Sequence, residues 1–299
     1  MDAESEALKR FEELKPGLLD DDEDARYEVA KEVSRLGRPV LASIMELARN
    51  PHPLMREMAC FMLREVGEPP EPWNRIYPDG IPILVDLLDN DLVADVRGSA
   101  AIALGFHKEF TTLPALFSAA DDPSEDVRYG VTHALGCFSR DMFDEHPEFE
   151  LYRTQAISTL LRLTHDPDDD VRDWATFGLH NMGHDTSEVR KRFWELLDDP
   201  HDDVRGEAAA GLGKFGDQTL IPRLRELLKD DEMSHCGYFE AAEFLGDPSL
   251  LPEVLAAAKA WKQNLDESEG SSVFVDLAVA SLRNAAGGTD DDKSTVGDD

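Results

Sequence analysis

The chain has 299 residues, 41% of them hydrophobic, which is enough for one large or two ordinary domains with a sizeable core. Lysine and arginine number 30 against 63 aspartates and glutamates, and the formal net charge is −33. A surface this negative repels phosphate groups, which argues against direct binding to nucleic acid or to an anionic membrane.

The N-terminal segment, residues 1–7, has neither a basic region nor an apolar run of the kind found in signal sequences. No apolar run approaches the roughly 18 residues that span a membrane. The cysteines Cys60, Cys137 and Cys236 are far apart and form no CxxC pair, which argues against a disulfide framework or a zinc site. We expect an unprocessed cytoplasmic protein.

The phrase Asp-Val-Arg recurs along the chain, and the copies occupy residues 95–97, 126–128, 170–172 and 203–205. From Arg26 through Arg56 to the arginines of these copies, successive intervals are 30, 41, 31, 44 and 33 residues, about one helical hairpin each. Apolar or small residues follow each arginine at offsets of three, four and seven, which is one face of a helix. Amphipathic stretches that end in acidic, often proline-containing turns precede the phrases.

This pattern predicts an all-α superhelical solenoid over residues 1–286. We expect eight hairpins, at about 3–37, 38–67, 79–108, 111–140, 152–184, 186–216, 218–247 and 249–286. His235 replaces the arginine in the seventh hairpin. The segments 67–79 and 139–150 are predicted loops, and residues 287–299 are predicted to form a disordered acidic tail.

The sequence Asp-Pro-x-Asp-Asp-Val-Arg-x-x-Ala-x-x-x-Leu-Gly at 199–213 resembles the HEAT-like repeats of the phycobilin-lyase type. The resemblance implies a right-handed solenoid whose second helices line the concave face. It also implies a ladder of turn residues between repeats, which would be Asp95/Arg97, Asp126/Arg128, Asp170/Arg172 and Asp203/Arg205. Repeats of this type occur in scaffolds, adaptors, bilin lyase subunits and a few enzymes, so we interpret the ladder residues as structural.

Signals for catalysis are weak. Di-iron hydroxylases with this repeat type carry His-Glu dipeptides just after the repeat arginine, and no His-Glu dipeptide occurs in this chain. His180 and His184 are four residues apart and Asp185 follows, a spacing compatible with a metal site, but helix capping or solvation is the favoured interpretation. We predict no catalytic residues, no metal and no cofactor.

The candidate binding surface lies on the outer side of the second helices. If offsets of three, four, seven and eleven after the repeat arginine face the core, offsets of two, five and nine face outward. In the middle repeats these positions are mostly apolar or aromatic, and the predicted partner-binding residues are Met58, Phe61, Ile102, Phe106, His133, Trp174 and Phe177. A rotation of the helix phase by one residue would instead bury several of them as core.

We therefore predict a non-enzymatic protein-interaction scaffold or regulatory adaptor that binds a partner protein on the concave face, the partner being basic or presenting an apolar helix. The alternative is a lyase or chaperone-like subunit acting on a tetrapyrrole-bearing or otherwise modified protein. The acidity has three interpretations: a basic partner, mimicry of nucleic acid, or a salt-rich environment.

Overall fold

The computed structural model describes residues 2–67, 76–229, 235–264 and 272–286, so the predicted tail at 287–299 and most of the predicted loop at 67–79 lie outside the described residues. The described residues form α-helices joined by short turns, and their one strand-like pairing is an antiparallel bridge between Gly67 and Ile76. None of the described helices is both long and apolar enough to cross a membrane. The chain divides into two compact units, Met1–Gly178 (unit 1) and Leu179–Asp299 (unit 2).

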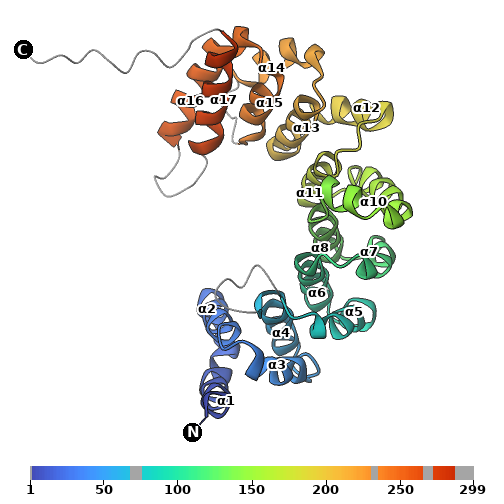
Figure 1. Ribbon diagram of the computed structural model, residues 1–299, viewed down its shortest axis with the longest axis vertical. Coiled ribbons are helices and arrows are strands. Elements are labelled where there is room, and N and C mark those ends of the chain that lie inside the picture. The colour runs from blue at the N-terminus through green and yellow to red at the C-terminus, as the bar shows by residue number, and fades with distance from the viewer. Residues whose placement is uncertain (1, 68–75, 230–234, 265–271, 287–299) are drawn as a thin grey trace, which may run out of the picture. The chain divides into compact units, whose positions relative to one another are not determined.

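Unit 1 begins with the helix α1 (Ala3–Leu14), and the helices that follow form two layers (Figure 1). The first layer consists of α3 (Leu41–Leu47), α5 (Ile81–Asn90), α7 (Leu113–Ala119) and α10 (Glu150–Leu163). The second layer consists of α2 (Glu23–Ser34), α4 (Pro53–Glu65), α6 (Ala94–His107), α8 (Glu125–Gly136) and the part of α11 (Asp169–Asn181) up to Gly178. Successive second-layer helices pack directly against one another, so their outer faces form one surface.

Unit 2 continues the same alternation after the last residues of α11. Its further helices are α12 (Ser187–Leu196), α13 (Asp202–Lys214), α14 (Ile221–Leu227), α15 (Gly237–Leu245), α16 (Leu251–Asn264) and α17 (Ser272–Ala285). Within this unit α13 packs against α15, and α15 packs against α17. The predicted all-α solenoid of helical hairpins is confirmed.

The predicted loop at 139–150 is wrong. The segment contains a helix, α9 (Arg140–Glu145), followed by a 3₁₀ turn at Pro147–Phe149. Its aromatic side chains explain the order: Phe143 is buried and lies 5.1 Å from the Phe110 ring, on which Phe149 stacks at 4.4 Å between centroids. Packing the buried Phe143 and the half-buried Phe149 against Phe110 stabilises what is otherwise an insertion between hairpins.

The ladder between repeats exists, but its carboxylates are not the predicted ones. Arg97 makes a two-pronged ion pair with Asp122 at 2.8 and 2.9 Å, and Arg128 does the same with Asp166 at 2.7 and 2.9 Å. In each case the partner is the aspartate directly before the proline of the next hairpin's turn, Asp122-Pro123 or Asp166-Pro167. The aspartate two residues before the arginine, as at Asp95, is exposed on the first turn of its own helix, because the arginine side chain extends away from it.

The second-layer helices approach each other closely because small residues stand at the contacts. A Cβ atom added to Gly105 of α6 would lie 2.5 Å from Cα of Ala134 in α8, and one added to Gly130 would lie 2.6 Å from the carbonyl oxygen of Gly98. Gly98 faces the start of α8 and Gly105 faces its end, so the two helices run parallel. This parallel packing aligns the same offsets of neighbouring helices on one face.

We expect Gly105→Ala to lower the free energy of unfolding by about 1–2 kcal/mol, although alanine is the better helix former. The added methyl group meets helix backbone, which can move only if α6 and α8 separate. Urea unfolding monitored by circular dichroism measures the change. Ser99→Ala, at a half-buried position of the same helix, is the control; a neutral or stabilising Gly105→Ala would contradict the close approach.

Candidate functional site

A row of ring side chains crosses the outer face of the second layer in unit 1. It runs from Tyr27 on α2 to Phe61 on α4, 4.9 Å apart, and from Phe106 on α6 to His133 on α8, stacked at 5.7 Å. Trp174 on α11 follows at 4.3 Å from His133. We call these five side chains the aromatic row.

The gap in the row between α4 and α6 is bridged by a cation. The Arg64 guanidinium carbon lies 4.3 Å from the Phe61 ring centre and 4.7 Å from that of Phe106. Attraction between a guanidinium and ring faces is worth about 0.5–2 kcal/mol per contact, so Arg64 holds the two halves of the row together. Five helices thus contribute to one connected surface.

The structure brings together most of the predicted binding residues. Phe61, Phe106, His133 and Trp174 belong to the row, and all are half-buried. Two more of the predicted binding residues, Ile102 on α6 and Phe177 on α11, are also half-buried. The Phe177 ring lies 5.4 Å from the Trp174 ring.

Met58 is the exception: its side chain is fully buried, so the prediction that it faces outward is wrong. Met58 stands two residues after the repeat arginine, a position beside the contact between neighbouring second-layer helices. Gly130 stands at the same position in its repeat and packs against Gly98 of the neighbouring helix. A long, flexible methionine at such a border fills core space instead of facing solvent.

Three contributors to the surface were not predicted. Tyr27, Glu57 and Tyr129 each stand one residue after a repeat arginine. This position is not among those expected to face outward. All three are half-buried, and the Tyr129 ring lies edge-on to Trp174 at 6.3 Å. Aromatic residues at the same offset in two repeats were the signal that could have identified them.

His133 is an uncharged ring in this row. Burial, reinforced by the positive charge of Arg64, lowers the pKa of His133 from 6.5 to about 4. Its Nδ1 atom is buried and makes no hydrogen bond within the described part of the chain. A neutral imidazole between two rings acts as a third aromatic surface, in keeping with packing and not with proton transfer.

Carboxylates border one side of the row. Because α6 and α8 run parallel, their first turns lie at the same edge. The first turns of α2, α6, α8 and α11, though not that of α4, are acidic and contain Glu23, Asp24, Asp95, Glu125, Asp126 and Asp170. The hydroxyl groups of the two tyrosines lie near this edge. Burial and then nearby carboxylates, Glu57 for Tyr27 and Asp170 for Tyr129, raise the pKa of each phenol.

A pocket of about 420 Å³ opens at the end of the row nearest the N-terminus. It is lined from three helices, α2, α4 and α6, by Asp24, Tyr27, Lys31, Glu57, Phe61, Arg64, Ser99 and Ile102. Glu57 forms no hydrogen bond or ion pair with any residue in the described ranges. Burial, followed by repulsion from Asp95, raises the pKa of its carboxyl group.

Unit 2 contains a separate buried polar cluster that is structural. Glu207 on α13 accepts a hydrogen bond from Nε2 of His180, and Nε2 of His235 lies 3.3 Å from its other oxygen. Nδ1 of His235 accepts from the Gly237 amide at 3.1 Å, which leaves its proton on Nε2, facing Glu207. His235 thus replaces the ladder arginine of its hairpin with a 3.3 Å contact to Glu207 on the neighbouring helix.

The residues whose spacing would be compatible with a metal site do not come together. His180 bonds to Glu207, whereas Asp185 pairs with Arg190 through both carboxylate oxygens. Over the described ranges, no group of three or more histidine, cysteine or acidic side chains is arranged to hold a metal ion.

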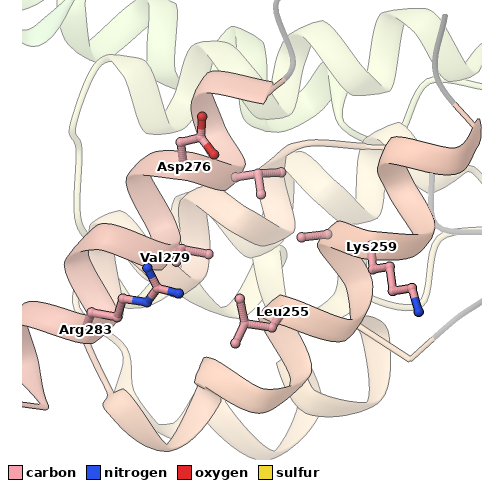
Figure 2. A pocket seen from close by; sticks show the side chains of 7 residues that line it. Leu255, Lys259, Asp276, Val279 and Arg283 are labelled. Carbon is pink, nitrogen blue, oxygen red and sulfur yellow. The ribbon is translucent and has the colours of Figure 1, made fainter. Parts of the chain in front are cut away.

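A second pocket, of about 530 Å³, lies between α16 and α17 in unit 2 (Figure 2). Figure 2 shows Leu255 and Lys259 on one helix and Asp276, Val279 and Arg283 on the other. Among the described residues, its wall is mainly aliphatic and includes no aromatic side chain. It therefore lacks the rings that distinguish the face in unit 1, although the carboxylate of Asp276 lines it.

Sequence comparison places these features in a family. A model of HEAT repeats matches residues 11–105, 81–180, 157–236 and 189–262. Protein YibA of Escherichia coli K12 is 27% identical over 243 residues, which cover 79% of this chain and 80% of YibA.

Solved structures give the same result for the fold. The X-ray structure of Escherichia coli YibA matches 91% of this chain and 92% of its own, with a TM-score of 0.62 and 25% identity. Kap95p, solved with RanGDP, matches 92% of this chain and 38% of its own, with a TM-score of 0.52 and 15% identity. The CpcE–CpcF phycocyanin lyase of Nostoc matches 57% and 97%, with a TM-score of 0.45 and 21% identity. With four overlapping matches from residue 11 to residue 262, the chain belongs to the HEAT repeat family.

Proposed function

We propose that this protein is a non-enzymatic interaction scaffold or regulatory adaptor, and that unit 1 binds a basic segment of a partner protein along the aromatic row. The observation that carries the proposal is the row itself: five half-buried rings on five helices, joined by ring contacts and, between Phe61 and Phe106, by Arg64, with carboxylates along one edge. Partly exposed aromatic residues that form one contiguous patch are typical of protein-binding surfaces.

The length of the row indicates the size of the segment. Neighbouring packed helices lie about 8–10 Å apart, so the four intervals from α2 to α11 span about 32–40 Å. An extended peptide rises about 3.3 Å per residue, which corresponds to about 10–12 residues. The segment would lay apolar or aromatic side chains on the rings and basic ones toward the acidic edge.

The free thiols fit a protein of the reducing cytoplasm, which is where we propose that it acts. Cys60, Cys137 and Cys236 are unpaired in the structure, and burial raises the pKa of Cys236 to about 12. Thiols held in the protonated form react slowly with oxidants, so these cysteines serve packing.

The test is selection from a displayed library of peptides about 12 residues long, followed by measurement of affinity for the selected sequences. We expect peptides that combine lysine or arginine with aromatic or aliphatic residues, bound more weakly at high salt. Trp174→Ala should weaken binding by about tenfold or more, since truncating a tryptophan in such an interface commonly costs over 1 kcal/mol.

The matched control is Leu151→Ala, which removes a side chain that is 75% exposed on the first layer of unit 1. Phe177 is left intact, because its ring packs over Gly136 and its loss would disturb the core. Far-UV circular dichroism establishes that both variants are folded. Equal effects of the two substitutions, or no selection of basic peptides, would contradict the proposal. Tight binding of a free tetrapyrrole would favour the lyase alternative instead.

A further inference from the structure

We propose that the pocket lined by Tyr27, Glu57 and Phe61 binds one lysine or arginine side chain of the partner segment. This inference rests on the proposed function and identifies the chemistry that would be recognised at one end of the aromatic row. It assigns Glu57 as the anion that pairs with the incoming cation and Tyr27 as the ring that covers it.

The first observation is the state of Glu57. Its side chain is half-buried on α4, beside two rings, and no cation in the described ranges lies within ion-pairing distance of it. The two lining cations are engaged elsewhere: Lys31 pairs with Glu28 at 2.8 Å and Arg64 with Glu65 at 3.1 Å. A partly desolvated carboxylate without a partner costs free energy, and a cation entering the pocket would offset that cost.

The second observation is the charge around the pocket. Asp24 lines it directly, and Glu23 and Asp95 are close enough to Glu57 to disfavour its ionised form. Arg26, the cation that opposes them, is held by the backbone carbonyl groups of Asp20 and Asp21. The pocket therefore attracts a positive group and repels a negative one.

The third observation is the use that the same face already makes of a guanidinium. Arg64 lies against the Phe61 ring at 4.3 Å, on the side toward Phe106, while the Tyr27 ring meets Phe61 at 4.9 Å and lines the pocket. A cation beside Glu57 would thus contact a ring face and a carboxylate at the same time. Arg64 already makes the same combination of contacts, with the rings of Phe61 and Phe106 and the carboxylate of Glu65. The volume of about 420 Å³ leaves room for one long side chain.

The experiment uses the blocked amino acids N-acetyl-lysine methylamide and N-acetyl-arginine methylamide as probes, with the norleucine analogue as an uncharged control. Binding to the full chain is followed by backbone amide chemical shifts. We expect saturable shifts confined to α2, α4 and the start of α6 with lysine or arginine, and none with norleucine. Glu57→Gln should weaken binding by about tenfold or more, the loss expected for a charge-assisted contact.

Two controls separate recognition from folding and from general charge. Glu188→Gln removes the same charge from an exposed position in unit 2 and should leave probe binding unchanged. Glu57→Gln should unfold at the same or a higher temperature than the native protein, because it removes an unfavourably placed carboxylate. Unfolding at a lower temperature would show that Glu57 is structural and would overturn the proposal.

The outcomes also distinguish this pocket from the row. If library peptides bind and Trp174→Ala weakens them, but the probes do not shift α2 and α4, the pocket assignment is wrong and the proposed function stands. If the probes bind and library peptides do not, the pocket recognises a cation independently of the row. Equal binding of norleucine would show an apolar pocket and contradict the role of Glu57.

Discussion

Arg128→Ala should lower the free energy of unfolding by about 3 kcal/mol, one of the largest effects expected for a single side chain of this protein. Arg128 joins two hairpins: it holds Asp166 with two hydrogen bonds, and its Nη1 donates to the carbonyl oxygen of Asp122 at 3.0 Å. The side chain of Asp166 is only 6% exposed. Removal of the Arg128 side chain would leave the buried Asp166 carboxylate without the guanidinium that pairs with it.

The pKa values of the ladder show how strongly this pairing acts. Burial disfavours the ionised form of Asp166, yet the hydrogen bonds from Arg128 and the Asp168 amide outweigh it and lower the pKa of the carboxyl group. Because contacts in a repeat protein are between neighbours, the loss should also reduce the cooperativity of unfolding.

Urea denaturation followed by circular dichroism measures this change. The control is Arg140→Ala, whose ion pair with Asp144 is exposed on both sides and should contribute little. In the double variant with Asp166→Ala, the two losses should be markedly less than additive. Additive losses, or a loss for Arg128→Ala no larger than for Arg140→Ala, would show that the ladder does not couple the hairpins.

Acidification from about pH 7 to about pH 5 should destabilise the protein through two half-buried histidines, by about 2 kcal/mol each. Burial lowers the pKa of both His107 and His133 from 6.5 to about 4. Between these values the unfolded chain binds a proton that the folded chain does not. The stabilisation is therefore fully present above pH 6.5 and is lost as the pH falls toward about 4.

His133→Phe isolates one of these contributions. The phenyl ring can keep the stacking on Phe106 and the contact with Trp174, and it removes the buried Nδ1 that has no hydrogen-bond partner among the described residues. We expect the variant to lose about 2 kcal/mol less than the native protein over the same pH interval. Urea unfolding at both pH values provides the comparison.

His52→Gln, at an exposed position before α4, should reproduce the native pH profile. A native-like profile for His133→Phe would mean that His133 is protonated in the folded protein and that its ring is more accessible than the structure shows.

The helical hairpins could be predicted because the same types of residue recur at the same positions in each repeat. Arginines at intervals of 30 to 44 residues, compact residues at fixed offsets and acidic turns all agree on one repeating unit. The outward phase was also right for most of the surface, because offsets of five and nine point clearly away from the core, as at Phe61 and Phe106.

What failed depended on contacts between repeats, which a local pattern does not contain. Met58 is buried because its offset lies at the border between neighbouring helices. The ladder aspartates were assigned to the wrong position because both aspartates of a turn recur with the arginine, and only the packing of hairpins decides which one it reaches. The segment predicted as a loop forms a helix because Phe143 packs against Phe110, which is distant in sequence.

Mapping a selected basic peptide onto the full chain would show whether the second layer of unit 1 is the binding surface. The peptide would carry a photoreactive group at one position at a time, and mass spectrometry would identify the attached residues. We expect attachment along α2, α4, α6, α8 and α11, in the order of the peptide positions. Attachment to the first layer of unit 1, or to the pocket between α16 and α17, would contradict this expectation.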